Sequence, residues 1–155
     1  MEFPVQVFPI PVRIEIAVYK AVQHIAAAFW DCDKLEQIIF GEALTSIGNN
    51  AFSSCKKLKN IDIPDSVINI GESAFEYCEN LKSVVIGNSV IKIGKHAFAS
   101  CENLEKVVIG NSVANIGKCA FYGCDNLKRV VIPKGSKEKF KNMLCSRFAA
   151  KLFEE

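Results

Sequence analysis

The sequence predicts a solenoid, in which short repeats stack and each repeat contacts only its neighbours. Three residue types recur in step, and a period of roughly 20–50 residues is typical of repeat architectures. A cysteine returns every 23 residues, a phenylalanine after an alanine keeps the same step, and a leucine follows each cysteine by three residues. The cysteines are Cys32, Cys55, Cys78, Cys101 and Cys124, with Phe29, Phe52, Phe75, Phe98 and Phe121, and Leu35, Leu58, Leu81, Leu104 and Leu127. Such a fold favours a binding surface over an enzyme.

Composition narrows the class further. The 155 residues are half hydrophobic, which suits a folded domain, and the formal charge of +2 gives no electrostatic argument for nucleic acid. No apolar run reaches the roughly 18–20 residues of a membrane span. Prolines interrupt the apolar N-terminus and no basic segment precedes it, so it is not expected to be a signal peptide. The chain as it stands is therefore expected in the cytoplasm, and at the cell surface or secreted if it is a fragment of a longer protein.

Residues 1–27 depart from the period. Counting back by 23 from Ile47 and Ile38 gives His24 and Glu15, which do not suit a core. Alternation at Val12, Ile14, Ile16 and Val18 is typical of a strand, whereas Val18, Val22, Ile25 and Phe29 fit one helical face. The segment is a divergent first coil, an irregular cap or foreign sequence, and we favour the cap. A poorly covered end would favour a homodimer through the N-terminus.

Residues 28–133 carry the repeats, which Leu58–Cys78 represents. Leu58, Ile61 and Ile63 alternate as in a half-buried strand, and Pro64 ends it because proline lacks an N–H. Val67 and Ile70 are expected to point inward, and Gly71 to permit a corner. Ala74, Phe75 and Cys78 are spaced for one helical turn. No single unit can bury its own apolar side, so we expect identical residues to stack in columns about 5 Å apart.

This pattern resembles the BspA-type leucine-rich repeat. The motif positions are filled by Ile61, Ile63, Pro64, Val67, Ile70, Gly71, Ala74, Phe75 and Cys78, and the neighbouring copies fill them likewise. The resemblance implies a leucine-rich-repeat solenoid, a right-handed α/β superhelix with a parallel sheet on one face and short helical turns. It also implies a non-catalytic protein–protein interaction module, with adhesion to host proteins or cell-surface contact as the common role. An intracellular scaffold or effector is the alternative.

Residues 134–155 predict a C-terminal capping helix. Ser136 is expected to cap it, and apolar residues recur at helical spacing from Lys137 to about Phe153. Such a helix would cover the open end of the core.

The cysteines invite chemistry but favour structure. Zinc ligands usually come as Cys or Cys/His pairs about two to four residues apart, whereas these cysteines are 23 residues apart and no histidine joins them. The ladder is therefore expected to be a buried column without metal or cofactor. Cys119 is expected to be more exposed than the ladder, and Cys145 to be packed on the capping helix. The odd total of seven cysteines, together with the absence of a signal peptide, suggests a reducing compartment. His96 and Cys119 stack one coil apart and form the only candidate dyad, which makes a cysteine-dependent enzyme a remote alternative.

Binding is expected on the outward face of the sheet. Ile39, Asp62, Val85, Val108 and Val131 form one outward column, and Gln37, Asn60, Ser83, Lys106 and Arg129 form the other. An apolar patch with a polar rim is typical of a contact site, although β-branched residues also simply suit strands. The candidate contact residues are therefore Ile39, Asp62, Val85, Val108, Val131, Lys106 and Arg129, with Trp30 as an exposed anchor for a protein partner of unknown identity.

Overall fold

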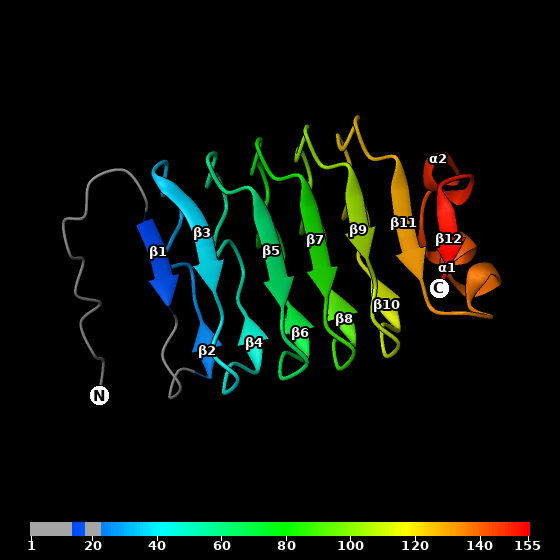
Figure 1. Ribbon diagram of the computed structural model, residues 1–155, viewed down its shortest axis with the longest axis horizontal. Coiled ribbons are helices and arrows are strands. Elements are labelled where there is room, and N and C mark those ends of the chain that lie inside the picture. Colours follow the sequence, from blue (N-terminus) through cyan, green and yellow to red (C-terminus); the bar gives the residue numbers. More distant parts are fainter. Residues whose placement is uncertain (1–13, 18–22) are drawn as a thin grey trace.

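A computed structural model describes residues 14–17 and 23–155 and confirms the solenoid (Figure 1). Coils stack along one axis, and each coil from β1 to β10 contributes one long and one short strand. The long strands are β1 (Ile14–Ala17), β3 (Leu35–Ile39), β5 (Asn60–Ile63), β7 (Ser83–Ile86), β9 (Lys106–Val108), β11 (Arg129–Ile132) and β12 (Leu152–Glu154). The short strands are β2 (His24–Ile25), β4 (Ser46–Ile47), β6 (Asn69–Ile70), β8 (Lys92–Ile93) and β10 (Asn115–Ile116).

All strand pairs are parallel because each coil repeats the path of the last, and the register shifts only in the β1–β3 pair, between Ile14 and Glu15. One sheet runs from β5 through β7, β9 and β11 to β12, the short strands form a second sheet, and β1 pairs with β3. Asp62 lies opposite Val85, and Val85 opposite Val108, so equivalent residues form columns across the strands. The long ladder is interrupted between β3 and β5, where the Lys59 N–H reaches the Glu36 carbonyl at 3.4 Å.

The third side of each coil is a turn, not the helical turn that the sequence predicted. Along this turn the N–H groups alternate between two kinds of acceptor. Phe52 donates to the Ala74 carbonyl of the next coil at 2.8 Å, whereas Ser53 donates to Asn50 within its own turn at 3.3 Å. Residues in the left-handed region stand on either side of the phenylalanine, as at Asn50 (φ 56°) and Ser54 (φ 63°). A helix would direct its N–H groups to carbonyls of its own coil. The turn is therefore not helical, because half of its N–H groups bond the next coil instead.

The core consists of stacked columns, as predicted. The rings of Phe29, Phe52, Phe75, Phe98 and Phe121 lie 5.1–5.5 Å apart, within 6° of parallel. Beside them, Cys55, Cys78, Cys101 and Cys124 are fully buried, and Cys32 is half-buried. Each buried thiol donates a hydrogen bond of 3.1–3.3 Å to the carbonyl of the phenylalanine one coil back. The cysteines therefore fill space and also satisfy a carbonyl.

Burial of these thiols predicts a loss of stability in alkali. Burial raises the pKa of Cys124 from 9.0 to about 12. As pH rises above 9, Cys124 of the unfolded chain releases a proton that the folded chain retains, so the free energy of unfolding falls, by about 1 kcal/mol from this thiol at pH 10. Urea unfolding at about pH 7.5 and pH 10 measures this loss. Cys124→Ala should reduce the pH dependence, and an equally steep loss in that variant would contradict the assignment.

The glycines at the corners serve close packing and not the turn itself. The sequence assigned Gly71 to a backbone conformation that other residues resist, but among the described glycines only Gly123 and Gly135 have positive φ. A Cβ placed on Gly71 would lie 2.4 Å from the carbonyl carbon of Gly48 in the preceding coil. Gly94 and Gly117 meet their preceding coils at 2.3–2.5 Å in the same way. The backbones of successive coils thus touch along this column, and no side chain fits between them.

The first coil is shorter than the others, and the strict count of 23 misplaces its residues. Ile25 pairs with Ile47 and Ile16 with Ile38, a step of 22 residues. Ile25 is buried and occupies the core slot that the count assigned to His24. Residues 18–22 lie outside the described part of the chain, so the choice between a divergent coil and a cap for residues 1–27 stays a prediction.

The C-terminal segment closes the core, but as two short helices and a strand. Helix α1 (Lys137–Met143) and helix α2 (Ser146–Ala149) are separated by extended backbone at Leu144 and Cys145. The predicted helix to Phe153 ends early because Leu152–Glu154 forms β12 and pairs with β11, which one straight helix could not reach. Phe140, Leu144, Phe148 and Leu152 are buried against the last coil. Ser136 precedes α1 as expected, but its hydroxyl donates to the Pro133 carbonyl at 2.5 Å and does not cap the helix.

Candidate functional site

The outward face of the long sheet carries the predicted column of apolar side chains. Ile39 is 51% exposed and Val85 is 40% exposed, while Val108 is half-buried. Val131 follows in register, but it is buried, with 3% exposed. The expectation that its side chain is open to solvent is wrong, because β12 adds a strand beside β11 and places Phe153 opposite Val131.

Phe153 is a surface residue of this face that the sequence did not reveal. It was expected inside the capping helix, yet it is 43% exposed at the end of the outward column. The Arg129 guanidinium lies 4.7 Å from the centre of its ring and also bonds Glu155 at 3.0 Å. The apolar column thus ends in an aromatic ring that carries a cation, a combination typical of interface anchors. The sequence did contain one sign of this position: Phe153 follows Val131 by 22 residues, close to the repeat length of 23.

The charged residues divide the face into two ends. Asp62 lies in β5, whereas Lys106 and Arg129 lie in β9 and β11, with Arg129 opposite Lys106 in register. Among the described residues, neither Lys106 nor Asp62 has an ion-pair partner. Asn60 and Ser83 join the polar column through a 2.8 Å hydrogen bond from the Ser83 hydroxyl. The outward face therefore presents apolar side chains bordered by Lys106, a cation without an ion-pair partner among the described residues.

Trp30 lies apart from this face. It is 63% exposed, as predicted, but it belongs to the turn of the first coil and not to the sheet. Tyr122 occupies the equivalent position in the fifth coil and is 69% exposed, so the two aromatics lie four coils apart. They do not form one anchor with the column of Val85 and Val108.

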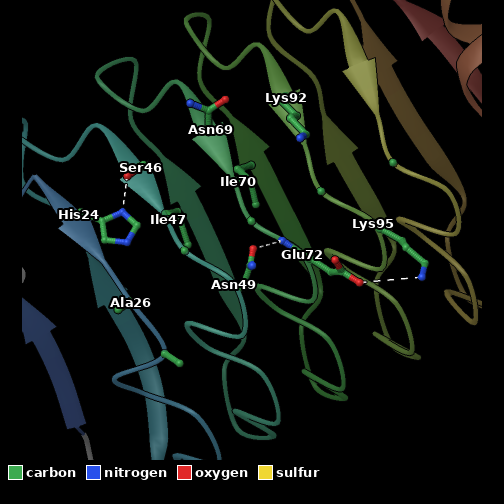
Figure 2. A pocket seen from close by; sticks show the side chains of 15 residues that line it. His24, Ala26, Ser46, Ile47, Asn49, Asn69, Ile70, Glu72, Lys92 and Lys95 are labelled. Carbon is green, nitrogen blue, oxygen red and sulfur yellow. Dashed lines mark hydrogen bonds and ion pairs between the residues drawn. The ribbon is translucent and has the colours of Figure 1, made fainter.

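A second surface is the shallow groove along the short strands, shown in Figure 2, which encloses about 770 Å³. Gly48, Gly71, Gly94 and Gly117 line it, and their absence of side chains is already explained by coil contact. The polar side chains along it include Asn49, Asn69, Glu72, Lys92 and Lys95. Most of its polar contacts join neighbouring coils: Asn49 accepts from the Glu72 N–H at 2.8 Å, and Glu72 lies 3.9 Å from Lys95.

The groove also contains a serine–histidine contact that the sequence did not suggest. His24 Nδ1 and Ser46 Oγ are 2.5 Å apart (Figure 2). A catalytic serine needs a base whose ring is oriented by a third group. In the described part of the chain no carboxylate bonds His24, so this pair is a contact between neighbouring coils.

The candidate cysteine dyad is formed by Cys119 and His96, which occupy equivalent positions in neighbouring coils. Cys119 is half-exposed, which confirms that it differs from the buried ladder, but no hydrogen bond joins it to His96 among the described residues. Both residues have left-handed backbones, at φ 59° and 54°, because both occupy the first position of a turn. Cys145 was expected to be packed and is exposed, because it lies at the break between α1 and α2. No group of three or more metal-binding side chains gathers among residues 23–155.

Parallel coils, repeated columns and an open sheet face define a solenoid repeat protein. The family model for the BspA type leucine rich repeat region matches residues 24–147 in six copies. The chain belongs to this family.

Solved structures agree. A leucine-rich repeat protein from Bacteroides ovatus is 35% identical with a TM-score of 0.69, over 77% of this chain and 33% of its own. A leucine rich cell surface protein from Faecalibacterium prausnitzii is 31% identical with a TM-score of 0.78, over 83% of this chain and 34% of its own. The leucine rich repeat protein of T. pallidum is 33% identical with a TM-score of 0.73, over 76% of this chain and 58% of its own. The chain thus spans about a third of the length of the first two.

A search of curated protein sequences finds no match to this chain. In the described residues, no helix has the length and apolar character required to cross a bilayer.

Proposed function

We propose that this chain is a non-catalytic protein-interaction module that binds its partner on the outward face of the long sheet. The observation that carries the proposal is the outward column, in which Val85 and Phe153 of the long sheet are at least 40% exposed and Val108 between them is half-buried. Ile39, in β3 beyond Asp62, extends this exposed apolar surface past the edge of the sheet. Soluble monomers rarely leave aligned apolar side chains open without a contact to make. Asp62, Lys106 and Arg129 form the polar border, and the buried Val131 lies opposite Phe153 on the neighbouring strand.

Contact at a cell surface is the role that we favour for this module. The F. prausnitzii relative is described as a cell surface protein, and the chain covers only 34% of that protein. A short stretch of coils within a longer surface protein would present the same face to a host protein. An intracellular scaffold would use the face identically, so fractionation of the source cells with an antibody against the solenoid separates the two roles.

Photo-cross-linking tests the face directly. A benzophenone side chain at position 85 should capture a partner, whereas the same group at position 91 should not, because Ile91 is 46% exposed beyond the outward column. In a chain that carries the benzophenone at position 62, opposite Val85, Val85→Glu should reduce capture at least tenfold, because a buried unpaired carboxylate opposes association. The free energy of unfolding should change by less than about 0.5 kcal/mol, since the site is exposed. Equal capture from positions 85 and 91 would remove the sheet face as the binding surface.

A further inference from the structure

Two cysteines outside the ladder line one pocket at the C-terminal end of the solenoid. Cys119 lies in the last turn of the repeats, and Cys145 lies between α1 and α2. Both line one pocket of about 320 Å³ between the last coil and the C-terminal segment. Phe121, Met143 and Phe148 also line it, which makes its surroundings largely apolar.

These two thiols differ from the buried ladder in their bonding. Cys78, Cys101 and their equivalents are fully buried, and each donates to a phenylalanine carbonyl. In the part of the chain that the structure describes, neither Cys119 nor Cys145 has a hydrogen bond from its sulfur, and Cys145 is exposed. A small disulfide can therefore reach Cys145, whereas the buried ladder is closed to it.

Cationic side chains and unbonded N–H groups lie beside the two cysteines. Lys118 lines the pocket, and the charge of Arg147 interacts with Cys145. The N–H groups of Cys119 and Phe121 have no acceptor among the described residues, although their equivalents in earlier coils all donate to the next coil.

We propose that Cys119 and Cys145 are a thiol pair that a low-molecular-weight disulfide, such as glutathione disulfide, converts into a reversible disulfide. The Cys145 thiolate attacks one sulfur of the small disulfide and displaces a thiolate. Cys119 then gives its proton to solvent, and its sulfur attacks Cys145 and displaces the second thiolate. The protein loses two electrons and two protons, and the small disulfide is reduced to two thiols.

The bond would fasten the C-terminal segment to the last coil. The two parts already pair through β11 and β12, and near the pocket they meet through the edge of Phe148 on Phe121, 6.4 Å between ring centres, and an exposed 2.7 Å ion pair from Arg147 to Asp125. Closing the loop between residues 119 and 145 restricts the unfolded chain, so the oxidised protein should melt about 5 °C higher than the reduced one.

The test incubates the full chain in glutathione buffers of increasing oxidised fraction. Free thiols are then blocked with N-ethylmaleimide, and the peptides are mapped by mass spectrometry without reduction. We expect a linked Cys119–Cys145 peptide that disappears on return to reduced glutathione, together with the rise in melting temperature. Cys119→Ser should stop at one glutathione on Cys145, because the resolving thiol is gone. Serine is compatible with this position, since Ser73 holds the same left-handed conformation two coils earlier.

Three results would overturn the proposal: no change in mass, a bond between two chains, or glutathione on Cys145 of the wild type with Cys119 still free. Cys32→Ser is the matched control, because Cys32 is half-buried at the other end of the solenoid. It should leave the linked peptide unchanged.

Discussion

Gly94→Ala is expected to cost about 4 kcal/mol of stability or to prevent folding, because the added methyl group has no room. A Cβ at this position would lie 2.4 Å from both the carbonyl carbon and the oxygen of Gly71 and 2.5 Å from the Glu72 nitrogen. All three are backbone atoms, so no side-chain rotation relieves the collision. Relief requires the coils to separate, which lengthens the hydrogen bond from the Gly94 N–H to the Ile70 carbonyl, now 2.8 Å.

Chemical denaturation monitored by circular dichroism measures this effect. Gly135→Ala is the control, because Gly135 has φ 77° but no atom within 4 Å of an added Cβ. It should cost only the roughly 1 kcal/mol of a left-handed alanine. If Gly94→Ala lowers the free energy of unfolding no more than Gly135→Ala does, contact between coils does not explain the glycine column.

Phe75→Ala is expected to cost about 4 kcal/mol, since it leaves a cavity in the middle of a continuous stack. The Phe75 ring lies 5.3 Å from Phe52 on one side and 5.3 Å from Phe98 on the other, and it is fully buried. The neighbouring rings cannot close the gap, because the hydrogen bond from the Phe75 N–H to the Ala97 carbonyl and its equivalents hold the coils at fixed spacing.

Phe153→Ala provides the contrast, because this ring is 43% exposed on the sheet face. It should lose about 1 kcal/mol, mainly from the contact with Arg129. Thermal unfolding of the two variants distinguishes a core column from a surface ring. A cost below about 2 kcal/mol for Phe75→Ala would mean that the stack relaxes around the cavity.

The sequence predicted the repeated interior correctly because identical residues must meet when coils of equal length stack. Phe75 and Cys78 lie in columns for that reason alone, and the outward alternation of Val85 and Ser83 follows from the pleat of the strand. The turns were missed for a physical reason as well. Ala74, Phe75 and Cys78 have helical spacing, but whether an N–H bonds within its own coil or to the next one depends on how close that coil lies.

The surface was only partly predictable. Val131 alternates like Val85, yet it is buried because β12 returns beside β11. The same return of the chain exposes two other residues. Phe153 was expected in a helix and lies on the sheet face, and the Cys145 thiol was expected to be packed and is exposed. Each depends on the break after Leu144, which the helical pattern of the C-terminal segment conceals.

The sequence by itself determined the period, the parallel stacking of coils and the identity of the core columns, since these depend only on which residue recurs at each step. The tertiary structure decided what happens where the recurrence ends. The first coil takes a 22-residue step, the last segment returns as a strand, and both ends set which side chains remain exposed. Local spacing cannot specify these outcomes, because they depend on contacts between segments that no repeated neighbour constrains.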